Sequence, residues 1–183
     1  TKYPGNLLKQ VDYFLRIFRM PVSVLFLSML GFYVLLLIFR VDPLLSVAGA
    51  AGYGFSSFFF LILAAGHNTQ AIALAYMAPM IGAIYYSYRY NAIKGAILTA
   101  FLLALEILSN HPQITYYSGI CLLVFVITEF IFSVRSRTLK NFFRTTAILI
   151  IPVILAVGIN FASLYTFYEY GKYSIRGKSE LSV

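Results

Sequence analysis

The sequence predicts an all-α, polytopic membrane bundle of about six transmembrane helices, preceded by an interfacial amphipathic helix. Hydrophobic residues make up 61% of the 183 residues and charged residues only 11%, whereas soluble domains are about 45–50% apolar and about 25% charged. The apolar residues gather into uninterrupted runs, close to the ~20 residues that cross a bilayer core. The lipid bilayer is therefore the first partner that we expect.

The charge of the chain also fits a membrane protein. The net charge is +8, but the Lys and Arg residues lie in short turns and near the termini, where they set topology or contact lipid headgroups. We therefore expect no nucleic-acid partner. Cys121 is the only cysteine, so no disulfide forms within the chain.

The N-terminal segment, residues 1–20, is predicted to be an interfacial helix. Its Leu, Val and Phe residues recur at helical spacing, and Lys9, Asp12, Arg16 and Arg19 occupy the other face. An amphipathic helix ahead of a span generally lies in the plane of the membrane surface.

Six spans are predicted after this helix, within a single transmembrane domain that covers residues 1–183. Ala48, Gly52 and Ser56 are spaced four residues apart in the second span, which predicts a close helix–helix contact. Pro79 predicts a kink in the third span. A polar tail on the outer face ends the chain. The predicted boundaries are 22–39, 44–65, 70–88, 92–109, 114–134 and 145–164 for the spans and 165–183 for the tail.

The turns between the predicted spans alternate in charge. The turns at 40–42, 89–94 and 135–144 contain lysine and arginine, whereas the turns at 66–69 and 109–113 contain neither and hold both histidines. The positive-inside rule assigns the basic turns to the cytoplasm. The histidine turns, the N-terminal helix and the tail are then expected together on the extracytoplasmic face.

Candidate binding residues are polar side chains on that face. The histidine turns could contact a substrate or a phosphate, and loop capping is the alternative role for the histidines. The tyrosine pair that begins the fifth span either anchors the chain at the interface or lines the site. The tail adds a glutamate and a cationic cluster of the kind that binds phosphate, either in a lipid headgroup or in a lipid-linked substrate. The candidates are His67, Asn68, Asn110, His111, Gln113, Tyr116, Tyr117, Glu169, Lys172, Arg176 and Lys178.

Two glutamates lie inside spans. Glu106 shares a helix face with Asn110, and a carboxylate at that depth usually faces a polar cavity or a partner. We therefore expect Glu106 to act as a general base, a proton carrier or a cation partner, or else to form a structural ion pair or hydrogen bond. Glu129 is expected to snorkel to the cytoplasmic interface, toward Arg135.

No cofactor is expected. A divalent metal is the less favoured alternative, because the two histidines would need a third ligand such as Glu106 or Glu169. The chain also has no Gly-rich dinucleotide fingerprint and no pair of cysteines.

Three motifs resemble the YfhO family of bacterial membrane proteins, in the form of its Bacteroidetes members. They are Gly66-His67-Asn68, the segment 110–117 and the segment 169–181. That family is similar to GT-C glycosyltransferases, which pass a sugar from a polyprenyl-phosphate carrier to a glycan, lipid or protein. The resemblance implies a multi-pass protein of the bacterial inner (cytoplasmic) membrane, with a lipid-linked sugar donor and a cell-envelope glycan, lipid or polymer as acceptor.

The resemblance also implies an internal fragment. Family members begin with a further span and a large outer loop carrying an acidic motif, so the catalytic acid is expected outside this chain, with Glu106 as the fallback base. Lys172, Arg176 and Lys178 would stabilise the departing phosphate. A transporter or flippase, and a structural or assembly subunit, are the alternatives. The sugar, the acceptor and the oligomeric state stay open.

Overall fold

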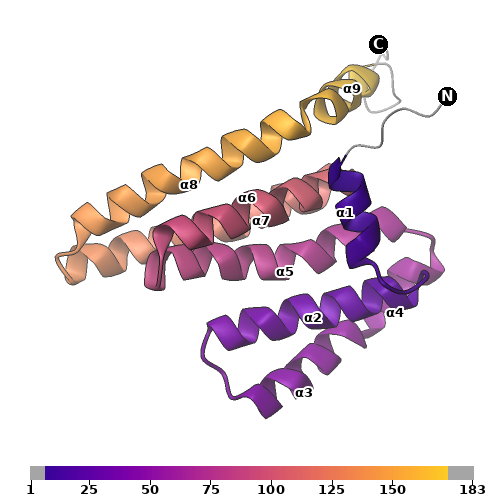
Figure 1. Cartoon of the computed structure of the whole chain (residues 1–183), viewed down its shortest axis with the longest axis horizontal. Helices are drawn as coiled ribbons and strands as arrows, with labels where there is room; N and C mark the ends of the chain where they lie inside the picture. Colours follow the sequence, from indigo (N-terminus) through magenta and orange to yellow (C-terminus); the bar gives the residue numbers. More distant parts are fainter. Residues whose placement is uncertain (1–6, 173–183) are drawn as a thin grey trace, which may run out of the picture.

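The computed structural model describes residues 7–172, and within that range all regular secondary structure is α-helical (Figure 1). The prediction of an all-α fold is confirmed. The helices are α1 (Leu7–Leu15), α2 (Val22–Ile38), α3 (Pro43–Gly54), α4 (Ser57–Ala64), α5 (Asn68–Arg89), α6 (Ala92–Leu108), α7 (Pro112–Arg135), α8 (Leu139–Ile159) and α9 (Phe161–Lys172).

Several of these helices identify a membrane protein. In the described part of the chain, four helical segments are long and apolar enough to cross a bilayer, and α2 is a shorter apolar helix. Only 17% of the apolar window of α7 is buried inside the protein. The rest of that window needs an apolar solvent, which lipid provides. The four segments are Pro43–Ala64, Asn68–Arg89, Pro112–Arg135 and Leu139–Ile159.

The centre of the bundle is formed by α5, which packs against α2 on one side and α6 on the other. Helix α8 covers α6, and α3 packs on α2 (Figure 1). Small residues bring the α5 and α6 backbones together. A Cβ atom added at Gly95 would lie 2.6 Å from the Ser87 nitrogen and 2.8 Å from the Ala83 carbonyl oxygen. Such close backbone approach is typical of helices that pack within membranes.

Successive turns alternate between the two ends of the bundle (Figure 1). The α2–α3, α5–α6 and α7–α8 turns lie at one end, which we call the basic-turn end. The α4–α5 and α6–α7 turns lie at the other, which we call the histidine-turn end, and α1 and α9 lie there too. The predicted grouping of both histidine turns with the N-terminal helix is therefore present in the fold.

Left-handed backbone conformations end the helices at both ends of the bundle. Arg40, Gly66, Asn110 and Arg137 have φ values of 61°, 78°, 58° and 56°. Helices commonly end with such a residue, usually glycine and sometimes asparagine, because it directs backbone N–H groups to the last free carbonyls. At Gly66 the following N–H, that of His67, donates to the Ile62 carbonyl oxygen at 2.8 Å. The turns that carry the histidines are thus fixed by helix termination.

The second predicted span is interrupted, because α3 and α4 are separate helices. The predicted close contact at Ala48, Gly52 and Ser56 is wrong within this chain at its first two residues. Both are exposed, and a Cβ at Gly52 would meet nothing within 4 Å, whereas Ser56 is half-buried. The buried face of α3 carries Ser46, Ala50 and Gly54 instead. These residues also recur every four positions, so spacing alone could not select the correct face.

The sixth predicted span also has different limits. Helix α8 begins at Leu139, inside the stretch expected to be a basic turn, and ends at Ile159. Basic side chains in its first turns are compatible with helix because long cationic side chains can reach the interface from a helical backbone. The start of the predicted tail is helical in α9, whereas Arg176 and Lys178 lie outside the described residues.

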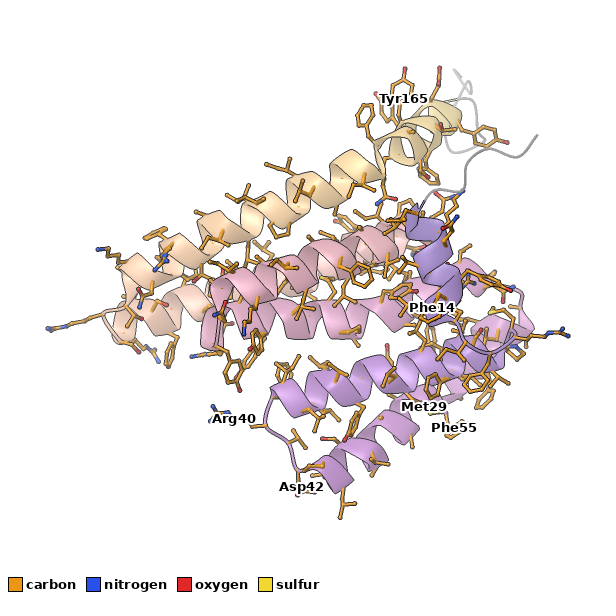
Figure 2. All side chains as sticks on the ribbon, in the orientation of Figure 1. Phe14, Met29, Arg40, Asp42, Phe55 and Tyr165 are labelled. Carbon is orange, nitrogen blue, oxygen red and sulfur yellow. The ribbon has the colours of Figure 1, made fainter. Side chains whose placement is uncertain are left out.

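Helix α1 places part of its polar face against the bundle. Tyr76 of α5 donates a hydrogen bond from its hydroxyl to Asp12 Oδ1 at 2.7 Å, and Arg16 Nη2 pairs with Asp12 Oδ2 at 2.6 Å. Phe14, on the expected apolar face, is 78% exposed (Figure 2), which is compatible with an interfacial helix. The expected division of faces is wrong at Asp12 and Arg16, which turn toward the bundle because the Tyr76 hydroxyl inside an apolar helix needs a hydrogen-bond partner.

Candidate functional site

The two histidine turns lie together at one end of the bundle. His67 is the residue before α5 and His111 is the residue before α7. Thr69 Oγ1 lies 3.4 Å from His111 Nδ1, and the two histidines are close enough to interact electrostatically. The structure thus joins two turns that are more than forty positions apart in the sequence, as the alternating turns predicted.

The surroundings of His111 favour its neutral form. Partial burial lowers the pKa of His111 below its usual value, and the nearby His67 lowers that pKa further. Burial disfavours a charged imidazole, and a like charge nearby acts in the same direction. A neutral imidazole has one donor and one acceptor nitrogen, so His111 can hydrogen-bond a hydroxyl group or accept a proton from it.

Polar and aromatic side chains continue this surface along the first turn of α7. Gln113 Nε2 donates to the Tyr117 hydroxyl at 3.0 Å. The Tyr116 and Tyr117 rings have centroids 5.9 Å apart, and both rings are exposed. Asn68 is exposed at the start of α5. We call His67, Asn68, His111, Gln113 and the two tyrosines the histidine-turn cluster.

A separate cavity links Asn110 to α9. Its volume is about 470 Å³, and its walls include Asn110, Thr166 and Tyr170. Glu169 is exposed on α9 but is not among the residues that line this cavity. The backbone of Lys172 ends α9, and the other two members of the predicted cationic cluster lie beyond the described range.

Glu106 is buried inside the bundle rather than placed at the turn surface. Its side chain has no exposed area, and Ser118 of α7 donates a hydrogen bond from Oγ to Glu106 Oε1 at 2.7 Å. Glu106 Oε2 is buried without a hydrogen-bond partner. The carboxylate therefore joins α6 to α7, and it cannot touch a substrate at the histidine-turn cluster without a rearrangement.

Asn160 is a polar residue that the sequence analysis did not single out. It is only 4% exposed, and its Nδ2 donates to the carbonyl oxygens of Ala104 and Ala156, each at 3.0 Å. This side chain ties the end of α8 to α6 beneath the cluster. An asparagine at the end of a long apolar run was the available signal, because such a residue inside a membrane usually bonds to a neighbouring helix.

At the basic-turn end, Glu129 pairs with a residue other than the expected one. Arg89 Nη2 lies 2.7 Å from Glu129 Oε1, so the expected approach toward Arg135 is wrong. Glu129 is buried at 5% exposure, and the Arg89 guanidinium also lies 4.5 Å from the centre of the Phe132 ring. Because α5 packs beside α7, Arg89 contacts Glu129 inside the bundle, and the Glu129 carboxylate does not extend to the membrane interface.

The described residues contain no cluster of side chains that could bind a metal ion. Within residues 7–172, no three His, Cys, Asp or Glu side chains gather closely enough to hold a metal ion. The donors of the histidine-turn cluster are mainly imidazole, amide and phenol groups, which suit hydrogen bonding to hydroxyl or phosphate oxygens.

Fold and cluster together define a helical membrane protein with a polar, aromatic-rimmed surface at one end of its bundle. No family model, curated protein or solved structure matches the chain. The resemblance to the YfhO family therefore stays a prediction.

Proposed function

We propose that this chain is part of an integral membrane glycosyltransferase of GT-C type. It would transfer a sugar from a polyprenyl-phosphate carrier to a cell-envelope acceptor on the extracytoplasmic face of a bacterial inner membrane. The observation that supports this most is the convergence of the two histidine turns at one end of an apolar bundle. A lipid-linked sugar keeps its chain in the bilayer and its sugar phosphate at the surface, so its site must lie at the ends of the spans.

The proposed topology has six crossings, made by α2, by α3 with α4, and by α5, α6, α7 and α8. Helices α2 and α6 have 17 residues each, about 26 Å at 1.5 Å per residue. This is slightly short of a bilayer core of about 30 Å, and the flanking turn residues complete each crossing. The basic-turn end then faces the cytoplasm under the positive-inside rule.

In this proposal the histidine-turn cluster holds the donor. His67, Asn68 and Gln113 would bind sugar hydroxyls or the phosphate, and neutral His111 would share that role. Tyr116 and Tyr117 would pack against the sugar ring, as exposed aromatic pairs can. Asn110 and Glu169 would border the acceptor side, next to the cavity against α9.

The remaining chemical roles fall to charged groups. Lys172, Arg176 and Lys178 would stabilise the negative charge on the departing phosphate, because cations aimed at developing charge lower the barrier. The base that activates the acceptor hydroxyl would be the carboxylate of an acidic residue outside this chain. Glu106 is the fallback base and would have to leave its hydrogen bond with Ser118 to serve.

Sugar transfer by the full-length protein tests the proposal. The protein is reconstituted into liposomes with a radiolabelled polyprenyl-phosphate sugar, and transfer is followed in His67→Gln and His111→Gln variants. Loss of one hydrogen bond to the sugar costs about 1 kcal/mol, so each variant should lose at least several-fold in transfer. Asn141→Ala, at the exposed start of α8 at the basic-turn end, should transfer like the wild type. Wild-type transfer in both histidine variants would rule out the cluster as the donor site.

One observation favours a transporter as the second candidate. The unpartnered Glu106 Oε2 is a buried carboxylate oxygen inside the spans, and such residues often mark ion or proton pathways. Substrate uptake into proteoliposomes that depends on Glu106, without sugar transfer, would favour this function.

A structural subunit is the third candidate. Its partner would contact the exposed Ala48 and Gly52 of α3, and a monomer that tolerates leucine at both positions would exclude that interface.

A further inference from the structure

A second cavity lies at the histidine-turn end, and none of its lining residues belongs to the histidine-turn cluster. It has a volume of about 900 Å³ and is bounded by α1, by the connection after it and by the start of α2. Two of its lining residues, Arg16 and Arg19, are cationic, and most of the others are aromatic or aliphatic. The proposed sugar transfer assigns no role to this cavity.

The apolar wall of this cavity is also exposed to the surroundings. Phe14 is 78% exposed, Ile17 is 71% exposed and Phe18 is 48% exposed. In a membrane protein, a helix that lies across the end of the bundle with such side chains outward inserts them into the boundary between headgroups and acyl chains. Acyl chains can therefore run along the same residues that form the cavity wall.

The cationic side of the cavity is held in place by the bundle. Asp12 accepts hydrogen bonds from both Tyr76 and Arg16, so the Arg16 guanidinium is fixed relative to α5. Arg19 forms no ion pair within residues 7–172 and is exposed. With Asp12 counted, the two arginines leave one net positive charge beside the cavity.

The backbone donors at the start of α2 are already occupied. Helix α2 begins after Pro21, which has no N–H group, and the Ser23 and Val24 nitrogens donate to the Arg19 and Pro21 carbonyl oxygens, each at 3.1 Å. The helix end therefore adds only its partial positive charge to the potential near the cavity, which Ser23 lines. A phosphate group placed here would pair with Arg19.

We propose that this cavity binds the phosphate headgroup of an anionic phospholipid from the surrounding bilayer, with its acyl chains along Phe14, Ile17 and Phe18. The cation and the exposed apolar wall match two parts of such a lipid, its anionic headgroup and its hydrocarbon. A free phosphate would use only the first. The bound lipid fastens α1 to the membrane surface at the same end of the bundle as the candidate donor site.

Lipid titration followed by native mass spectrometry tests this assignment. The delipidated chain in detergent is titrated with phosphatidylglycerol, with phosphatidylcholine, and with inorganic phosphate alone. The main variant is Arg19→Gln, because Arg19 is exposed and its loss leaves the Asp12 pairs intact. Arg19→Lys preserves the charge, and Arg135→Gln removes the same charge at the basic-turn end. An arginine near an anionic membrane surface contributes about fivefold to binding.

The proposal predicts that phosphatidylglycerol binds more tightly than phosphatidylcholine, that Arg19→Gln weakens this binding about fivefold, and that Arg19→Lys restores most of it. Arg135→Gln should bind like the wild type. Equal binding of the two lipids, or an equal loss in Arg135→Gln, would overturn the site. Phosphate that displaces the lipid completely at millimolar concentration would assign the cavity to free phosphate and overturn the lipid assignment.

Discussion

The ion pair between Arg89 and Glu129 gives the sharpest prediction about how the bundle is held together. It joins α5 to α7 through a 2.7 Å contact, and the two side chains differ in exposure: 33% for Arg89 and 6% for Glu129. The two single substitutions should therefore have unequal costs. Arg89→Gln leaves a carboxylate buried without its cation, whereas Glu129→Gln leaves a guanidinium that can still reach water and contact Phe132.

The magnitudes follow from these exposures. Removing one partner of a buried ion pair costs about 3–5 kcal/mol. Arg89→Gln should lie at the lower end, about 3 kcal/mol of unfolding free energy, because a cavity of about 190 Å³ borders Glu129 and can admit water. Glu129→Gln should cost about 1 kcal/mol, the range of a partly exposed pair. The double variant should resemble Glu129→Gln, which corresponds to a coupling free energy of about 3 kcal/mol.

The assay is equilibrium unfolding in mixed micelles, followed by loss of helical circular dichroism as the fraction of denaturing detergent rises. The wild type, both single variants and the double variant form one thermodynamic cycle. Arg135→Gln serves as the control, because the structure does not place Arg135 against Glu129. Equal costs for the two single variants, or costs that simply add in the double variant, would refute the assignment of this pair as a buried link between α5 and α7.

Two further predictions concern packing and pH. Gly95→Ala should lower the free energy of unfolding by about 2 kcal/mol, because the added methyl group meets the α5 backbone. Gly52→Ala should raise it by up to about 1 kcal/mol through helix propensity alone; the same unfolding assay measures both, and a loss in both would contradict the packing. The lowered pKa of His111 means that the folded state favours the neutral imidazole. Stability should be full above the ordinary histidine pKa of about 6.5 and fall as the pH drops through the lower folded value, less so in His67→Gln; a melting temperature that rises on acidification would contradict this.

The sequence predicted the helices and their turns well for a physical reason. Long apolar runs have few alternatives to helix in a bilayer, since every backbone polar group must be bonded internally. Turn positions also have local causes, because Gly66 and Asn110 adopt the left-handed conformation that ends a helix. The alternation of basic and histidine turns then required only an up-and-down path to place both histidines at one end.

The contacts between helices were less predictable. Arg89 and Glu129 are forty positions apart, and nothing local to Glu129 distinguishes Arg89 from the nearer Arg135. Asp12 faces inward because of Tyr76, sixty-four positions away. Helical periodicity defines the faces of a helix but does not say which neighbouring helix each face meets. The Arg89–Glu129 and Asp12–Tyr76 contacts both depend on that neighbour.

The candidate site requires that the α4–α5 and α6–α7 turns form one surface. The most direct test introduces Thr69→Cys and His111→Cys together in a Cys121→Ser background and adds a short crosslinker that reacts with two thiols. The observed 3.4 Å contact between these side chains predicts rapid crosslinking within one chain, detected by intact mass. A control pair, Thr69→Cys with Thr138→Cys, lies at opposite ends of the bundle and should not crosslink. Crosslinking of the first pair no faster than the control pair would contradict the claim.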